Sequence, residues 1–170
     1  MYNHHTSGND AFYQMLNDSP GRVGPPLERP SESIRDYFLE WLDRDGHPFW
    51  PWWSHVRSWW QIRNLPNLLL VHYANLKADM PGEIRRIATF LETPIDEQRW
   101  PAIFEYMKAH ATGIFSLAEG VFNGGAKSFF NKGTNGRWRD VLTADDIARY
   151  KEMAHEELGV ECANWLATGK

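Results

Sequence analysis

The basic stretch from Lys127 to Arg139 has the residue types that suit binding of an anion. It holds four cations and two glycines within thirteen residues. Gly133 and Gly136 would let backbone N–H groups approach a phosphate closely. Lys132 and the two arginines at the end of the stretch can supply charge-assisted hydrogen bonds. Composition alone favours a solvated turn with basic flanks, and a local anion site is the alternative.

Histidine and cysteine are the other residues that could carry chemistry. Seven histidines are present, with His4 and His5 adjacent, but no cysteine or carboxylate stands at ligand spacing from them. We therefore expect no metal site. His72 falls in an apolar run and fits a satisfied core residue. Cys162 is the single cysteine, which excludes an internal disulfide and favours a cytoplasmic location.

Charge and hydropathy exclude two classes of partner. The net charge is −4, so a general positive field for nucleic acid is absent. The longest apolar run, around Leu68 to Val71, is far shorter than the roughly 20 residues that span a bilayer. We expect no nucleic-acid partner and no membrane partner.

Nine tryptophans occur in the chain, and five of them lie between His47 and Trp60. Such density is typical of a packed core or of a binding platform for a sugar. We favour packing of a helix against a sheet. A tryptophan-rich carbohydrate-binding module, with Trp52 and Trp53 as its platform, is an alternative.

The periodicity of apolar residues predicts mostly helices after a loop-rich segment, 1–30. Helices are predicted from about Ser31 to the Asp43–Gly46 turn, from Trp53 to Ile62, after Asp79 and from Glu97 to His110. Thr143 and Asp146 form a capping-box pattern, and Gly159 marks the end of that last helix. The C-terminal segment, 137–170, is therefore predicted to be helical.

Residues 67–73 give the one convincing strand. Asn67-Leu-Leu-Leu-Val-His-Tyr73 is a short, continuous apolar run after a proline, as in a strand buried on both faces of a parallel sheet. With the helix after Asp79 it makes half of an α/β crossover unit. A single strand among helices covering 31–110 is an unusual inventory for a self-sufficient α/β domain.

Four ordered motifs make the sequence resemble the cytosolic sulfotransferases and their bacterial relatives. Asn131-Lys-Gly-Thr-Asn-Gly-Arg-Trp-Arg139 aligns without gaps with that family's Arg-Lys-Gly-x-x-Gly-Asp-Trp-Lys motif. Similar segments are Ile103–Lys108 (Ser-Phe-Glu-x-Met-Lys in the family), Leu69–Lys77 (a strand ending Tyr-Glu-Asp-Met-Lys) and Trp53–Trp60 (Tyr-x-His-Val-x-x-Trp-Trp). The resemblance implies an α/β fold, namely the C-terminal portion of a P-loop nucleotide-kinase-like parallel-sheet sulfotransferase fold, mostly helical in this chain.

The resemblance also implies a nucleotide site for 3'-phosphoadenosine 5'-phosphosulfate. Lys132 and Gly133 would bind the 3'-phosphate, Phe104 would stack on adenine, and Tyr73 would contact the adenine edge. The remaining residues that the resemblance assigns to this site are Asn131, Phe129, Phe130 and Met107. Two positions depart from the family: Asn131 replaces an arginine, and Ala102 stands where the family has a threonine.

The family's phosphosulfate loop, catalytic histidine and second 3'-phosphate site would all precede Met1. We therefore expect one partial sulfotransferase domain, 1–170, that contains no catalytic residue. It would be a fragment, a truncated product or a chain with a late start. Residues 111–136 would be a lid loop leading into the nucleotide-binding segment.

The complete enzyme would transfer a sulfuryl group to a hydroxyl or amine of a small molecule. Phe115, Phe122 and Phe129 suggest an acceptor with an apolar part. The chain alone is expected to be inactive. Its partner would be a polypeptide that supplies the missing N-terminal half, or a second copy in a homo-oligomer. A non-catalytic nucleotide-binding or interaction remnant is the alternative function.

Overall fold

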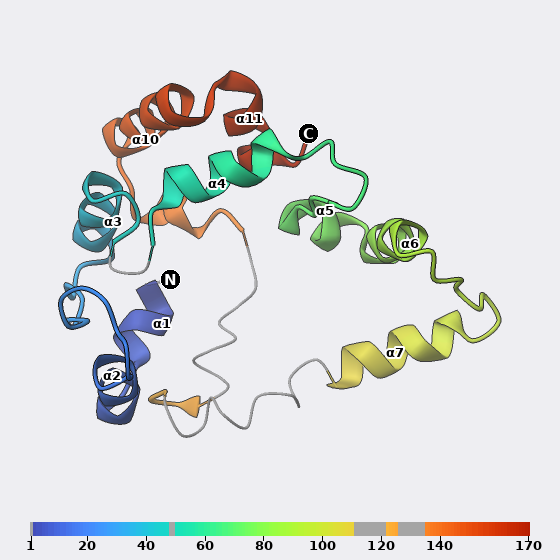
Figure 1. Ribbon diagram of the computed structural model, residues 1–170, viewed down its shortest axis with the longest axis horizontal. Coiled ribbons are helices and arrows are strands. Elements are labelled where there is room, and N and C mark those ends of the chain that lie inside the picture. Colours follow the sequence, from blue (N-terminus) through green and yellow to red (C-terminus); the bar gives the residue numbers. More distant parts are fainter. Residues whose placement is uncertain (1, 48–49, 111–121, 126–134) are drawn as a thin grey trace. The chain divides into compact units, whose positions relative to one another are not determined.

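The computed structural model describes residues 2–47, 50–110, 122–125 and 135–170 (Figure 1). Regular structure in these residues is helical. The helices are α1 (Tyr2–Ser7), α2 (Asp10–Asn17), α3 (Ile34–Asp43), α4 (Trp52–Gln61), α5 (Tyr73–Ala78), α6 (Met80–Phe90), α7 (Trp100–His110), the 3₁₀ helix η1 (Arg137–Asp140), α10 (Ala144–Leu158) and α11 (Val160–Thr168).

The chain divides into two compact units. Unit 1 comprises Met1–Leu39 and Pro101–Arg137, and unit 2 comprises Glu40–Trp100 and Trp138–Lys170. Each unit therefore combines two stretches that are far apart in the sequence. None of the helices in the described ranges is both long and apolar enough to cross a membrane.

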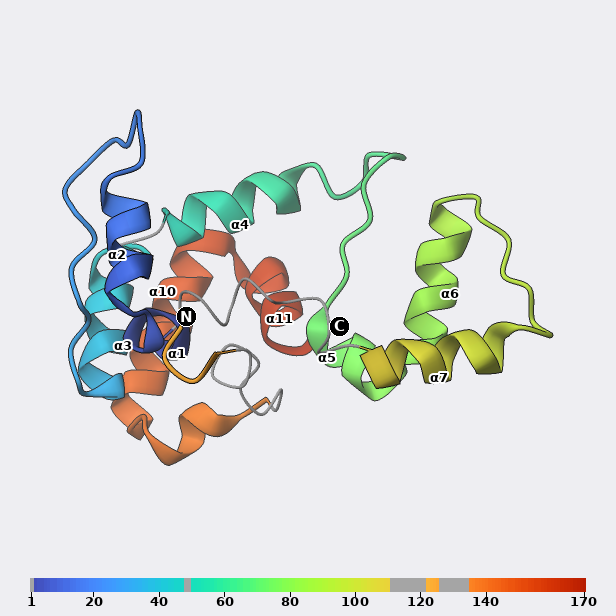
Figure 2. The same ribbon diagram turned by 90° about the horizontal axis from the view of Figure 1, so that it is seen from below.

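Unit 2 is organised around the packing of α4 against α10 and of α10 against α11 (Figures 1 and 2). Trp53 on α4 is only 4% exposed, and its ring lies 5.9 Å from that of Tyr150 on α10. Leu42 and Cys162 are almost completely buried in the same unit. The prediction that the tryptophan cluster packs a core is confirmed for Trp53, although its partners are helices and not a sheet.

A tight turn before α4 directs Trp53 into this core. Asp45 and Gly46 both have positive φ, 48° and 84°. A Cβ on Gly46 would lie 2.7 Å from the Trp50 carbonyl oxygen, so glycine is required there. The Asp45 carboxylate accepts a hydrogen bond from the Trp53 backbone N–H at 2.9 Å and so satisfies a free donor of the first turn of α4.

Local capping signals in the sequence are reproduced at α6 and α10. Asp79 accepts a hydrogen bond from the Gly82 N–H at 2.9 Å. At α10 the capping box is complete: the Thr143 N–H donates to the Asp146 carboxylate, and the Asp146 N–H donates to the Thr143 hydroxyl. Gly159, with φ of 76°, ends α10, as predicted.

The predicted strand 67–73 is not a strand in the structure. Residues 68–72 have no regular structure, Val71 is 40% exposed, and Tyr73 instead begins α5. A strand needs a ladder with a neighbour, and no described residue pairs with this run. The Leu70 carbonyl accepts a hydrogen bond from the Arg86 guanidinium at 3.1 Å. Among the described residues the one β-type pairing is an isolated bridge between Gly8 and Phe122.

Unit 1 begins with the helices α1 and α2, within the segment 1–30 that was expected to be loop-rich. His5, 3% exposed, places Nε2 2.8 Å from the Glu28 carbonyl oxygen. The Tyr13 hydroxyl donates to the His5 carbonyl oxygen at 2.6 Å, and the Arg29 guanidinium lies over the Tyr13 ring. Residues 18–33 then form the predicted irregular segment, held by two hydrogen bonds between Asn17 and the backbone of Leu27.

Replacing Trp53 by alanine should destabilise the protein strongly, because it leaves a cavity between α4 and α10. Loss of a buried tryptophan typically costs about 3–5 kcal/mol of unfolding free energy. The matched control is Trp50→Ala, since Trp50 is 58% exposed and three residues away. Urea unfolding followed by circular dichroism measures both variants. Equal effects of the two substitutions would contradict the assigned core.

Alkaline pH should destabilise unit 2 through Tyr150. Burial raises the pKa of this phenol above its ordinary value of 10.0. The unfolded chain therefore ionises first, so stability is intact below pH 10.0 and falls as the pH rises from there toward the raised pKa. Tyr150→Phe keeps the ring against Trp53 and should flatten this decline. Unfolding midpoints measured at several alkaline pH values test the difference, which an unchanged slope would refute.

Candidate functional site

Tyr73, the predicted adenine-edge contact, occupies the first position of α5. Its side chain is 49% exposed, so its ring is accessible to a ligand. The preceding residue, His72, is the N-cap of the helix, and its Nδ1 accepts the Ala74 N–H at 3.2 Å. The position of Tyr73 is thus set by a six-residue helix whose beginning depends on the His72 ring.

Phe104 and Met107 lie one helical turn apart on α7, in unit 1, and therefore on the same face of that helix. Phe104 is half-buried and Met107 is 40% exposed. An aromatic ring beside a thioether is a suitable apolar platform for a flat base. Ala102 is exposed and brings no hydroxyl to this helix.

The other predicted nucleotide ligands lie outside the described residues. These are Phe129, Phe130, Asn131, Lys132 and Gly133.

The residues that follow this segment are described from Asn135 onward. Gly136 has φ of 85°, a conformation that favours glycine and explains the second glycine of the motif. The guanidinium of Arg139 lies over the Trp138 ring, 4.5 Å from its centroid. Trp138 is 43% exposed, so this cation is at the surface. The last residues of the motif therefore present an arginine at the surface.

Phe122 packs against the junction of α1 and α2. Its ring centroid lies 5.3 Å from that of Phe12 and 5.9 Å from that of His4. The neighbouring Asn123 N–H donates to the Ser7 carbonyl oxygen at 2.7 Å, next to the bridge between Gly8 and Phe122. The sequence predicted one long lid loop, and nothing in its pattern indicated this attachment.

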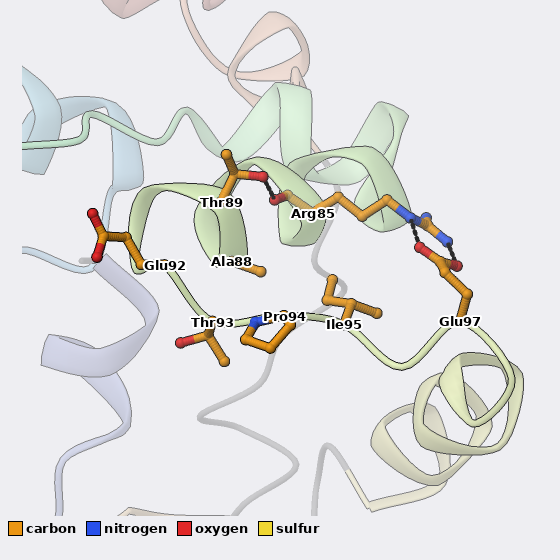
Figure 3. A pocket seen from close by; sticks show the side chains of 8 residues that line it. All are labelled: Arg85, Ala88, Thr89, Glu92, Thr93, Pro94, Ile95 and Glu97. Atoms are coloured by element: carbon orange, nitrogen blue, oxygen red, sulfur yellow. Dashed lines mark hydrogen bonds and ion pairs between the residues drawn. The ribbon is translucent and has the colours of Figure 1, made fainter.

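A pocket that the sequence did not predict lies in unit 2 between α6 and the segment 92–97 that follows it (Figure 3). Its volume of about 430 Å³ would admit a small molecule. The lining residues are Arg85, Ala88, Thr89, Glu92, Thr93, Pro94, Ile95 and Glu97.

Two charged residues that line this pocket, Arg85 and Glu97, form an ion pair with each other. Arg85 Nε and an Nη donate to the two Glu97 carboxylate oxygens at 2.9 and 2.7 Å (Figure 3). Their hydrogen bonding raises the pKa of Arg85 and lowers the pKa of Glu97. The guanidinium is already neutralised, and no cysteine, serine or histidine lines the pocket. We assign it no reaction.

His5 and His72 both form hydrogen bonds with the backbone. His5 is buried in unit 1, and His72 has both ring nitrogens within hydrogen-bond distance of backbone atoms. Within the described ranges, no group of three His, Cys, Asp or Glu side chains is arranged to hold a metal ion. The described residues of the candidate site, Tyr73, Phe104 and Met107, are side chains suited to contact with a ligand.

Comparisons with known proteins identify relatives over most of the chain. The family model described as "Sulfotransferase domain" matches residues 4–160. Sulfotransferase 2A6 of Rattus norvegicus is 26% identical over 137 residues, which cover 78% of this chain and 48% of that protein. Sulfotransferase 1C2 of Homo sapiens is 27% identical over 130 residues, covering 72% of this chain and 43% of that protein. The chain spans about half the length of the curated relatives it matches.

A solved structure resembles the fold as well. The crystal structure of mouse sulfotransferase SULT7A1 complexed with PAP superimposes with a TM-score of 0.65 and 19% sequence identity. The match covers 93% of this chain and 58% of that chain. The predicted fold class is thereby confirmed at the level of the sulfotransferase fold, while the parallel sheet remains a prediction.

Gly8→Ala should loosen the attachment of Phe122. An added Cβ would lie 2.4 Å from the Phe12 ring, which packs on Phe122. The expected cost is about 1–3 kcal/mol in overpacking, together with faster hydrogen exchange of the Asn123 amide. The double variant Gly8→Ala/Phe12→Leu should recover part of the protection because leucine frees space. Protection that stays at the wild-type level in Gly8→Ala would contradict this attachment.

Proposed function

The chain belongs to the sulfotransferase domain family, and on that premise we propose that it supplies the nucleotide-binding part of a sulfotransferase. The cosubstrate is 3'-phosphoadenosine 5'-phosphosulfate, and the product nucleotide is 3'-phosphoadenosine 5'-phosphate, or PAP. The observation that carries the proposal is the family match over residues 4–160, which includes the gap-free motif at 131–139.

Each proposed contact fits the chemistry of the nucleotide. Lys132 and the Gly133 N–H neutralise and bind the 3'-phosphate through charge-assisted hydrogen bonds. Phe104 stacks on adenine, and Tyr73 contacts its edge. The half-buried ring of Phe104 and the exposed ring of Tyr73 are accessible enough for these roles. The remaining site residues are Asn131, Phe129, Phe130 and Met107.

The reaction of the complete enzyme is an in-line sulfuryl transfer. The bond between sulfur and the 5'-phosphate oxygen breaks, and sulfur bonds to the hydroxyl or amine of the acceptor. The acceptor proton passes to a histidine base, and PAP leaves. No residue of this chain matches the family's base motif or its phosphosulfate loop, so we assign no catalytic residue here and propose that the chain alone is inactive.

The free energies support weak nucleotide binding by the chain itself. Stacking contributes about 1–3 kcal/mol and each charged hydrogen bond about 1.5–3 kcal/mol. Association costs at least about 4 kcal/mol, so the net affinity is millimolar or weaker. Activity would then require a polypeptide that supplies the remaining half of the fold. We propose that the enzyme is cytoplasmic, because its single cysteine is buried and forms no disulfide.

The sequence leaves two alternative functions open. A non-catalytic nucleotide-binding or interaction remnant would keep the contacts above without any transfer. The carbohydrate-binding alternative fits the structure poorly, because Trp53 is 4% exposed and cannot serve as a sugar platform. The acceptor of the sulfotransferase remains a small hydroxyl or amine compound with an apolar part.

PAP should bind with a millimolar dissociation constant, and Lys132→Ala should weaken it about tenfold through loss of one charged hydrogen bond. Saturation-transfer NMR on the adenine protons measures both values. Lys127→Ala is the matched control in the same basic stretch and should bind like the wild type. Absence of wild-type binding would refute the proposed nucleotide site, and micromolar affinity in calorimetry would refute the proposed weakness.

A further inference from the structure

The end of α11 is fastened to the start of α5 within unit 2. His72 Nε2 lies 3.0 Å from the Leu166 carbonyl oxygen, and Asn75 Nδ2 donates to the Gly169 carbonyl oxygen at 3.0 Å. The residues of each pair are 94 positions apart in the sequence. Figures 1 and 2 agree that the C-terminus lies beside α5.

The His72 ring forms hydrogen bonds with both α5 and α11. A carbonyl oxygen can only accept, so His72 Nε2 carries the hydrogen that is donated to Leu166. Nδ1 is then the acceptor, and it receives the Ala74 N–H at 3.2 Å as the N-cap of α5. Both functions require the neutral ring in this one tautomer. The side chain thus couples the first turn of α5 to the last turn of α11.

Gly169 completes the connection, in a conformation that favours glycine. It adopts the left-handed conformation with φ of 77°, and its N–H donates to the Trp165 carbonyl oxygen at 2.7 Å to end α11. A Cβ there would lie 2.6 Å from Asn75 Oδ1 and 2.8 Å from His72 Nδ1. A larger residue would therefore be strained and would displace the Asn75 and His72 side chains that form the connection.

The end of α11 also packs on α4 through aromatic rings. The Trp165 ring contacts the edge of the His72 ring, with centroids 5.3 Å apart, and lies 5.4 Å from the Trp60 ring. The guanidinium of Arg63 lies over the Trp60 ring, 4.2 Å from its centroid. The end of α11 is therefore fixed to α4 before it reaches α5.

Helix α5 needs such support because it has only six residues. Helices of this length are not stable by propensity alone, and tertiary contacts decide whether they form. Its packing against α6 is one such contact, and the connection to α11 is another. Tyr73 is the first residue of this helix and is exposed.

We propose that His72, Asn75 and Gly169 form a latch, called here the α5–α11 latch, that positions Tyr73 for the adenine ring. This inference rests on the proposed nucleotide site. His72, Asn75 and Gly169 are positioning residues that act through Tyr73. When the latch opens, only a fraction of molecules holds α5 in the binding geometry, and the apparent dissociation constant rises by the inverse of that fraction.

Three single variants test the latch in the full 170-residue chain. His72→Asn keeps a side-chain acceptor for the Ala74 N–H but is too short to reach Leu166. Asn75→Ala removes the bond to Gly169, and Gly169→Ala introduces the clash. Asn164→Ala, at an exposed position of the same helix, is the matched control. The measurements are amide hydrogen exchange of α5, the PAP dissociation constant by saturation-transfer NMR, and the urea midpoint.

We expect all variants to remain folded, because the core of unit 2 lies elsewhere. Latch variants should lose exchange protection at Ala74 and Asn75 and should bind PAP about three- to tenfold more weakly, as expected from one lost hydrogen bond. The double variant His72→Asn/Gly169→Ala should be no weaker than the poorer single variant, because both open the same latch. Asn164→Ala should match the wild type in every measurement.

The results separate this inference from the proposed function. Unchanged protection of α5 in the variants would overturn the latch. Lost protection with unchanged PAP affinity would overturn the positioning of Tyr73. If the wild type fails to bind PAP, the nucleotide site itself is wrong, and the exchange data still decide whether the latch exists.

Discussion

Burial of the aromatic face of α4 is the constraint on which unit 2 depends. Trp53 must be enclosed, and α10 with Tyr150 provides the covering surface. Further along α4, Trp60 receives Trp165 of α11. These contacts set where α10 and α11 lie, while exposed ion pairs such as Arg57–Glu157 and Arg63–Glu161 add little to stability. Because α11 is placed by α4, its last turn is available to hold α5.

The family motifs assign the proposed nucleotide contacts to separate stretches of the sequence. These are Tyr73 on α5, Phe104 on α7, and Lys132 with Gly133 in the basic motif. The chain carries a net charge of −4, so phosphate binding has to come from this local cluster and not from a general field. Aromatic stacking together with a phosphate contact through Lys132 would suit binding of a nucleotide, which is the role proposed above for this chain.

Local signals made much of the fold predictable from the sequence. The caps at Asp79 and Thr143, the stop at Gly159 and the turn at Asp45–Gly46 act over a few residues, and the structure reproduces them. The strand at 67–73 failed because a strand depends on a neighbouring strand, which no described residue provides. For the site, the family motifs predict Tyr73 and Phe104 as nucleotide contacts, and in the structure Tyr73 is exposed and Phe104 is half-buried. The hydrogen bond between His72 and the Leu166 carbonyl joins residues 94 positions apart, and no local sequence pattern could predict it.

The most direct test of the account is to locate PAP on the protein by intermolecular NOEs from its adenine protons. We predict NOEs to the ring protons of Phe104 and Tyr73, together with a shift of the Lys132 amide that depends on the 3'-phosphate and is absent with 5'-AMP. NOEs confined to other residues, or a Lys132 amide that responds equally to both nucleotides, would contradict the proposed site.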